Sequence, residues 1–233
     1  MFGRGGGRQK RHEIDMTQGS LLPKILAFSG PLILTGILQL LYNAADVIVV
    51  GQYAEGHAPL AAVSSTGSLI NLLVNVFMGL SVGASVVIAR SYGARDIVAM
   101  RKAEHTAMTL ALMMGIGVGV FGFLAARPLL ALMGSPEDVI DGATLYVKIY
   151  FLGMPANMLY NFGAAAMRAV GDTKRPMYYL MIAGIFNVLL NLLLVIVFRM
   201  DVAGVAIATV ASQVISMILV LGVHRRVDKA FQA

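Results

Sequence analysis

The 233-residue chain contains no cysteine and no tryptophan, and only 13% of its residues are charged. Because cysteine is missing, disulfide bonds and thiolate metal sites are excluded. A soluble domain usually carries about 25% charged residues, so the charge content here is about half of the usual value. Hydrophobic residues make up 58% of the chain, and the charges lie in clusters between long apolar runs. This composition is typical of a helical protein that crosses a membrane several times.

Motifs for catalysis and metal binding are also missing. The sequence has no HExxH motif, no nucleophile–histidine pair within an apolar run, and no phosphate-binding Lys-Ser/Thr after the glycines of RGGGR. The histidines lie in loops or at predicted helix ends, without the spacing of a metal site: His12, His57, His105 and His224. A membrane enzyme therefore has little support, and we expect neither catalytic residues nor a cofactor.

Six apolar runs are long enough to cross the ~30 Å hydrocarbon core as helices, since each helical residue rises ~1.5 Å. We therefore predict an all-α membrane protein, a bundle of six transmembrane helices over residues 21–224. Its spans are expected at about 25–50, 60–88, 106–126, 143–167, 177–198 and 202–223. Residues 1–20 are predicted to form a disordered basic tail, in which Met16 offers a second translation start. Residues 225–233 are predicted to form another tail.

Lysine and arginine are distributed unevenly between the two sides of this bundle. About fifteen of the eighteen lie in the N-terminal tail, the loops after the second and fourth spans, and the C-terminal tail. The positive-inside rule therefore predicts a cell-membrane protein with both termini in the cytoplasm. This topology accounts for the net charge of +6 without a nucleic-acid partner. A contact of the basic tail with RNA or anionic lipid is the alternative interpretation.

The first span carries a single carboxylate, Asp46, and a proline, Pro31. A charged residue inside a membrane helix costs about 2.5–3.5 kcal/mol on insertion scales, so it is usually either functional or neutralised. Gln39, Asn43 and Asp46 follow each other at i, i+4 and i+7, which places them on one face of the helix. Pro31 removes an intrahelical hydrogen bond and is expected to bend the helix.

Polar residues of the fifth and sixth spans are expected at a similar depth to Asp46. Asn187 and Asn191 lie one turn apart, and both Asn191 and Thr209 lie ~10 Å from the outer end of their helices, against ~6 Å for Asp46. A carboxylate among amide and hydroxyl oxygens can hold a proton or a hard cation such as Na⁺. In the alternative interpretation, Asp46 ends its helix at the water interface and the asparagines form ordinary interhelical hydrogen bonds.

Six segments, in their order and spacing, resemble the multidrug and toxic compound extrusion (MATE) family of antiporters. They lie between about residue 16 and the end of the chain: LILTGILQLLYNAADVIVVGQ after Pro31, LAAVSSTGSL, GLSVGASVVIARSYGARD, AMRAVGDTKRPM, NVLLNLLLVIVF and GVAIATVASQ. The resemblance implies a transporter that exports drugs and organic cations in exchange for H⁺ or Na⁺. It also implies that six helices form one lobe of a twelve-helix protein with two lobes.

The resemblance further implies roles for individual residues. The cation site of the family's N-terminal lobe matches Asp46, Asn187, Asn191 and Thr209. Pro31 and Gln39 also match family positions, and we expect Pro31 to act as a hinge and Gln39, Asn43, Asn157 and Asn161 to line a cavity. Many family members carry aspartate where this chain has Asn191. A single carboxylate weakens Na⁺ coordination and favours coupling through protonation of Asp46, although both ions stay open.

Six spans account for only one lobe, so the polar face that should line the cavity needs a partner, and the cytoplasmic tail 225–233 is expected to begin the linker between lobes. We expect either a truncated chain that pairs with a second six-helix lobe or a half-transporter that pairs with itself. One alternative is a non-transporting membrane fragment or scaffold. Another is a flippase for lipid-linked substrates, whose phosphates would require several cations. Lys148 is the only candidate within a predicted span, which argues against a flippase.

Overall fold

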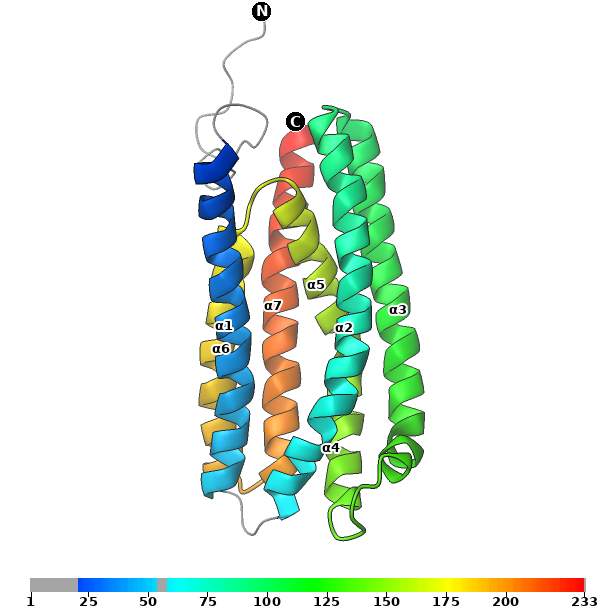
Figure 1. The fold of residues 1–233 in the computed structure, drawn as a ribbon, viewed down its shortest axis with the longest axis vertical. Coiled ribbons are helices and arrows are strands. Elements are labelled where there is room, and N and C mark those ends of the chain that lie inside the picture. Colours follow the sequence, from blue (N-terminus) through cyan, green and yellow to red (C-terminus); the bar gives the residue numbers. More distant parts are fainter. Residues whose placement is uncertain (1–20, 54–57, 233) are drawn as a thin grey trace, which may run out of the picture.

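The computed structural model describes residues 21–53 and 58–232, and within them it is a bundle of helices without strands (Figure 1). This confirms the predicted all-α membrane bundle, whereas the predicted 1–20 tail lies outside the described residues. The helices are α1 (Leu21–Tyr53), α2 (Ala58–Gly93), α3 (Ile97–Leu132), α4 (Ile140–Leu152), α5 (Met154–Ala169), α6 (Lys174–Leu192) with the π-helical turn η1 (Leu193–Val197), and α7 (Asp201–Gln232).

The longest helices extend well beyond the predicted spans. At 33 to 36 residues, α1, α2 and α3 are each about 50 Å long, whereas the hydrocarbon core is ~30 Å thick. For example, α3 begins at Ile97 rather than near residue 106, because Asp96 caps it by accepting a hydrogen bond from the Ala99 N–H at 2.9 Å. Similarly, α7 continues to Gln232 through most of the predicted tail 225–233.

The predicted 143–167 span is not one helix, because α4 ends at Leu152 and α5 begins at Met154. Pro155 explains the interruption, since it lacks an N–H group and its ring clashes with the carbonyl one turn earlier. Among the described residues, five helices are long and apolar enough to cross a membrane by themselves. The sixth predicted span corresponds to α4 and α5 together, with 13 and 16 residues.

Glycines of α3 allow its backbone to approach the α4–α5 junction closely. A Cβ atom added at Gly115 would lie 2.6 Å from Pro155 Cα, and one at Gly119 would lie 2.9 Å from the Phe151 carbonyl oxygen. Both glycines are buried. Close helix packing through small residues is a common source of stability within membranes.

The helix α1 is continuous through Pro31, so the expected bend does not interrupt it in this conformation (Figure 1). The Thr35 hydroxyl donates to the Pro31 carbonyl at 2.7 Å within the same helix. Such a bond from threonine to the preceding turn is associated with helix bending. Pro31 therefore remains a weak point of α1.

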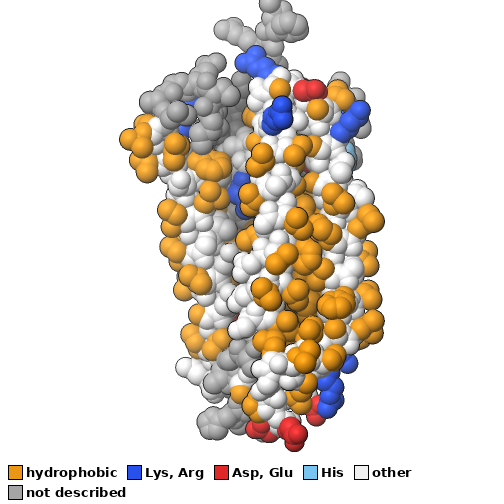
Figure 2. Space-filling view, turned by 45° about the vertical axis from the view of Figure 1, so that its right-hand side comes forward, with side chains coloured by type: hydrophobic (Ala, Val, Ile, Leu, Met, Phe, Trp, Pro, Cys, Tyr) orange, Lys and Arg blue, Asp and Glu red, His pale blue; other side chains and the backbone are white. Residues whose placement is uncertain are grey.

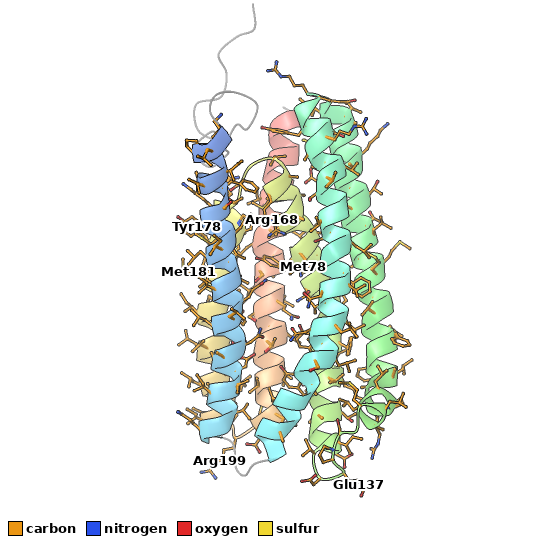
Figure 3. All side chains as sticks on the ribbon, viewed as in Figure 1. Met78, Glu137, Arg168, Tyr178, Met181 and Arg199 are labelled. Carbon is orange, nitrogen blue, oxygen red and sulfur yellow. The ribbon has the colours of Figure 1, made fainter. Side chains whose placement is uncertain are left out.

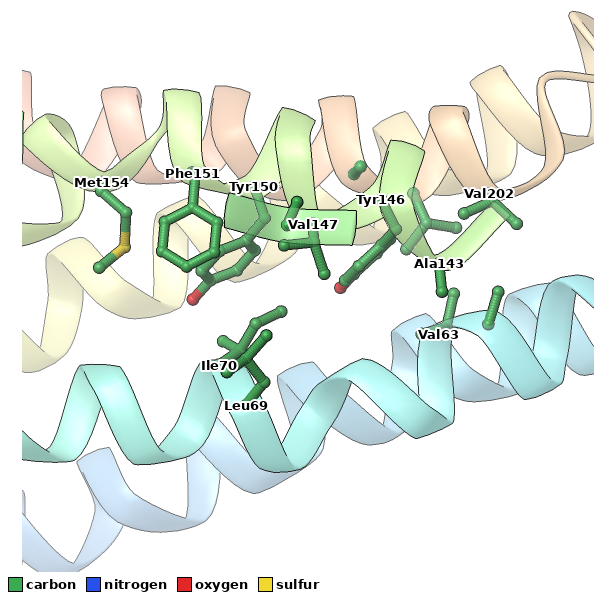
Figure 4. Close-up of a cluster of buried hydrophobic side chains, with 14 of the residues drawn as sticks. Val63, Leu69, Ile70, Ala143, Tyr146, Val147, Tyr150, Phe151, Met154 and Val202 are labelled. Atoms are coloured by element: carbon green, nitrogen blue, oxygen red, sulfur yellow. The ribbon is translucent and has the colours of Figure 1, made fainter. Parts of the chain in front are cut away.

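The core lies where α4 packs against α2 and α7 (Figure 4). Val147, Phe151 and Met154 of this region are almost fully buried. Tyr146 and Tyr150 stack with their ring centroids 6.3 Å apart, and Figure 4 shows their hydroxyl groups directed into the space between α4 and α2. The core therefore presents two polar aromatic groups on its inner side.

The outer surface is apolar over much of its length. Large exposed hydrophobic side chains lie along α1, α2 and α3, and on the face in Figure 2 most charged side chains gather at the two ends of the bundle. Exposure of such an apolar surface is unfavourable in water but favourable against lipid tails. The described helices are thus arranged as a transmembrane lobe.

Gly115→Ala is expected to lower the free energy of unfolding by about 1–3 kcal/mol, because the Pro155 backbone beside the new methyl group cannot rotate away. The matched control is Gly117→Ala, whose Cβ would meet nothing within 4 Å and which should be neutral or slightly stabilising. Thermal melting of the purified protein in detergent measures both variants. Equal melting temperatures for the two would contradict this packing.

Candidate functional site

Asp46 is the carboxylate around which the candidate site is built. Its side chain is only 5% exposed and lies where α1 packs against α6 and α7. Asn187 and Asn191 of α6 are fully buried beside it, and Thr209 of α7 is 7% exposed. The structure therefore brings together all four residues that the sequence suggested for a cation site.

The amide nitrogen of Asn191 bridges Asp46 and Asn187. This Nδ2 atom donates to Asp46 Oδ1 at 2.5 Å and to Asn187 Oδ1 at 3.1 Å. These two bonds use both of its N–H donors. Asp46 Oδ1 is therefore satisfied by the protein.

Asp46 Oδ2 is held differently. The Thr209 hydroxyl lies 3.3 Å from Oδ2 and 2.9 Å from the Val205 carbonyl oxygen. A hydroxyl group has one proton, so it can donate to only one of these acceptors at a time, and the shorter contact is to Val205. In that state the lone pairs of Thr209 Oγ1 point toward Asp46 Oδ2. This arrangement suits a proton on Oδ2 or a cation between the two oxygens.

Two further polar atoms of the site have no hydrogen-bond partner among the described residues, namely Asn191 Oδ1 and Asn187 Nδ2. Buried polar groups are normally paired, so the unpaired oxygen of Asn191 beside a carboxylate is an acceptor that a ligand could use. A hard cation prefers oxygen ligands, and the oxygens of Asp46, Asn191 and Thr209 provide them. The described residues contain no cluster of three or more histidine, cysteine, aspartate or glutamate side chains. The oxygen set therefore fits Na⁺ or a proton better than a transition metal.

Local structure sets the position of the asparagines. The π-helical turn η1 begins two residues after Asn191, and the Phe198 N–H donates to the Leu193 carbonyl at 3.2 Å. The following turn, where Figure 3 labels Arg199, holds Arg199 and Asp201 at φ angles of 50° and 41°, in the left-handed region. Widened turns of this kind occur often near functional sites. The sharp connection allows α6 and α7 to present Asn191 and Thr209 to the same carboxylate.

Asp46 also contributes to the wall of a cavity with a volume of about 630 Å³. The wall is formed by α1, α2, α4, α5, α6 and α7, and it includes all four residues that were expected to line a cavity: Gln39, Asn43, Asn157 and Asn161. Pro31 is not part of it. The last two asparagines are themselves linked, since Asn161 Nδ2 donates to Asn157 Oδ1 at 2.8 Å. A volume of this size is in the range of pockets that bind drug-sized ligands.

The chemistry of the wall favours cations. Among the described residues that line the cavity, Asp46 is the only carboxylate, and none is lysine or arginine. Lys148 is directed elsewhere, with its Nζ 5.3 Å from the centre of the Phe123 ring. The wall also contains four tyrosines that the sequence reasoning did not single out: Tyr42, Tyr146, Tyr150 and Tyr160. Tyrosine faces attract cations, so these side chains reinforce the effect of the carboxylate.

The sequence could have identified only two of the four tyrosines as a group. Tyr146 and Tyr150 are spaced by four residues and thus share a helix face, as do Asn157 and Asn161. However, a helical stripe of aromatic residues occurs more often in a packed core than in a ligand site. Only the fold reveals that these side chains, although buried, have an open space beside them.

Thr209→Val is expected to destabilise the protein by about 1–3 kcal/mol, because Asp46 Oδ2 loses the hydroxyl group that can donate to it when it is ionised or accept its proton when it is neutral. The cost should be clearly smaller in an Asp46→Leu background, since the interaction is then already absent. Thr109→Val is the matched control, because the Thr109 hydroxyl is exposed and bonds only within α3. Thermal melting gives the double-mutant cycle. The same cost in both backgrounds would mean that Thr209 does not act through Asp46.

Comparison with known proteins adds an independent line of support. The MatE family model matches residues 31–193. The probable multidrug resistance protein YpnP of Bacillus subtilis (strain 168) is 33% identical over 205 residues, which cover 88% of this chain and 46% of YpnP. The probable multidrug resistance protein YoeA of the same strain is 34% identical over 206 residues, which cover 87% of this chain and 44% of YoeA.

Solved structures agree with these matches. A crystal structure of MATE in the bent conformation has a TM-score of 0.81 and 27% identity to this chain, covering 87% of this chain and 45% of the other. This chain thus spans about half the length of the curated relatives that it matches. Because the family match covers well over half of the chain and includes Asp46, Asn187 and Asn191, the protein belongs to the MatE family.

Proposed function

We propose that this chain is one lobe of a multidrug exporter, which moves organic cations out of the cell in exchange for H⁺ or Na⁺. The observation that carries the proposal is the position of Asp46, which is buried against α6 and α7 and also contributes to the wall of a cavity of about 630 Å³. Membership of the MatE family supports transport, and two relatives are described as probable multidrug resistance proteins.

Exchange follows from competition for one negative charge. An organic cation in the cavity and a small cation at the carboxylate are both attracted to Asp46, and this attraction is strong because the surroundings are apolar. A proton or Na⁺ at Oδ2 neutralises the charge and so weakens the binding of the organic cation. By linkage, the organic cation must weaken the binding of the small cation to the same extent.

The site is compatible with either coupling ion. Asn191 provides an amide where a second carboxylate would strengthen Na⁺ binding, and this difference favours H⁺. On the other hand, Asn191 Oδ1 is an unpaired oxygen close to Asp46, which suits a metal ion. We expect α1 to bend at Pro31 when the charge of Asp46 changes, because Pro31 has no N–H group and α1 already lacks one intrahelical hydrogen bond there.

A partner completes the cavity in this proposal. Asn43 of α1 and Asn71 and Asn75 of α2 line the cavity but are exposed, half-way along helices that should lie in lipid. Exposed amides are unfavourable against lipid tails. A second six-helix lobe, or a second copy of this chain, would cover them, with both termini of this lobe in the cytoplasm. Transport of lipid-linked phosphates is not favoured, because no cation lines the described cavity.

Asp46→Asn is expected to abolish export of a fluorescent organic cation from cells that lack their own pumps, because the shared charge is lost. Export would be measured for the chain alone and for the chain co-expressed with the half of YpnP that this chain does not match. Asp141→Asn is the matched control, since Asp141 is exposed and pairs with Arg127 at 3.1 Å, outside the cavity.

Each outcome of this experiment has a defined meaning. Export by the chain alone that depends on Asp46 would establish a half-transporter that pairs with itself. Export only with the added half would establish a lobe that needs a complementary lobe. If the protein is folded in the membrane and neither combination exports the cation, the proposal is wrong and a scaffold role is favoured. Export by Asp46→Asn at the level of the unmodified chain would refute the mechanism.

A further inference from the structure

Gln213 continues the polar face of α7 away from the carboxylate. Thr209, Gln213 and Ser216 follow each other at i, i+4 and i+7, and all three line the cavity. On this face of α7, Thr209 contacts Asp46, and Gln213 and Ser216 border the cavity over the next two turns. Gln213 lies one turn from the carboxylate site and has no part in it.

The interruption between α4 and α5 creates the space that the Gln213 side chain occupies. A Cβ atom added at Gly153 would lie 2.5 Å from Gln213 Oε1 and 2.9 Å from Val210 Cγ2. The amide in its present orientation therefore occupies space that the absence of a Cβ atom at Gly153 leaves open. The hydroxyl group of Tyr150, which also lines the cavity, is a neighbour of the same amide.

The amide oxygen of Gln213 is not satisfied by the protein. Oε1 is buried and has no hydrogen-bond partner among the described residues. A buried acceptor without a donor destabilises a fold, whereas an apolar side chain of the same size would not have this cost. The Gln213 amide also forms a side-chain hydrogen bond with Tyr150, and Oε1 is still left without a donor. A hydrogen-bond donor in the adjoining cavity would satisfy this oxygen.

We propose that Gln213 is a substrate-contacting residue, whose side-chain amide accepts a hydrogen bond from an N–H group of the bound organic cation. This inference rests on the proposed function. A rotation about the side-chain torsions of Gln213 moves Oε1 from the space beside Gly153 into the cavity, which the side chain already borders. The contact selects protonated amines and amidinium groups over quaternary ammonium groups, which have no N–H.

The rest of the cavity does not make this distinction. The charge of Asp46 and the faces of the four lining tyrosines attract both kinds of cation. A variant without the Gln213 acceptor should therefore lose affinity for one class and retain it for the other. A purely structural role would affect both classes alike.

The test uses a matched pair of fluorescent ligands and the purified full chain in lipid nanodiscs. One ligand is a coumarin with a dimethylaminoethyl ether, protonated at neutral pH, and the other carries a trimethylammonioethyl ether. Gln213→Leu and Gln213→Met should each weaken the first ligand roughly tenfold, the loss expected for one hydrogen bond to a charged donor, and leave the second unchanged. A cooperative melting transition of each variant establishes that it folds.

The control variant is Gln52→Met, a substitution at the end of α1 outside the cavity, which should change neither affinity. If both ligands bind in an Asp46-dependent way but the Gln213 variants weaken them equally, or weaken neither, the role of Gln213 is refuted and the proposed function stands. If neither ligand binds the unmodified chain, either alone or assembled with the half of YpnP that this chain does not match, or if binding does not require Asp46, the proposed function fails as well. Two apolar replacements are used so that poor folding of one does not decide the result.

Discussion

Burial of a single negative charge is the constraint on which the rest of this structure depends. Asp46 can remain in an apolar bundle only because other helices bring polar atoms to it. Asn191 donates to one carboxylate oxygen, and Thr209 lies at the other. The widened turn η1 and the tight connection that follows place these two residues on neighbouring helices at the same depth. The carboxylate is therefore held on one side by α6 and α7 and borders a cavity on the other.

The cavity depends in turn on an interrupted helix. Pro155 prevents α4 and α5 from forming one straight span, and Gly115 and Gly119 let α3 pack directly against the junction. The interruption leaves space at Gly153 for the Gln213 amide, and α4 directs Tyr146 and Tyr150 toward the inside (Figure 4). The residues that shape the cavity and those that hold the charge are thus connected through α7, which carries both Thr209 and Gln213.

Much of the architecture could be predicted from the sequence, because long apolar runs and clustered charges specify spans directly. The grouping of Asp46, Asn187, Asn191 and Thr209 followed from comparing their depths. Other features could not be predicted in this way. The helix α3 begins earlier than the predicted span, because Asp96 caps it. For Pro155, the sequence does not determine whether a proline in an apolar run bends the helix or ends it. The tyrosines of the cavity wall were not singled out, because only packing determines which buried side chains border an open space. The bend expected at Pro31 remains a prediction for another conformation.

The central claim is that a small cation and an organic cation share the charge of Asp46. It is tested most directly by measuring how tightly the quaternary coumarin binds the purified chain in nanodiscs as the Na⁺ or H⁺ concentration rises. This ligand keeps its charge at every pH, so any change reflects the protein. We predict that at least one of the two ions weakens binding to the unmodified chain, and that neither affects the residual binding to Asp46→Asn. The account would be contradicted if neither ion changed the affinity of the unmodified chain, or if Asp46→Asn showed the same ion dependence as the unmodified chain.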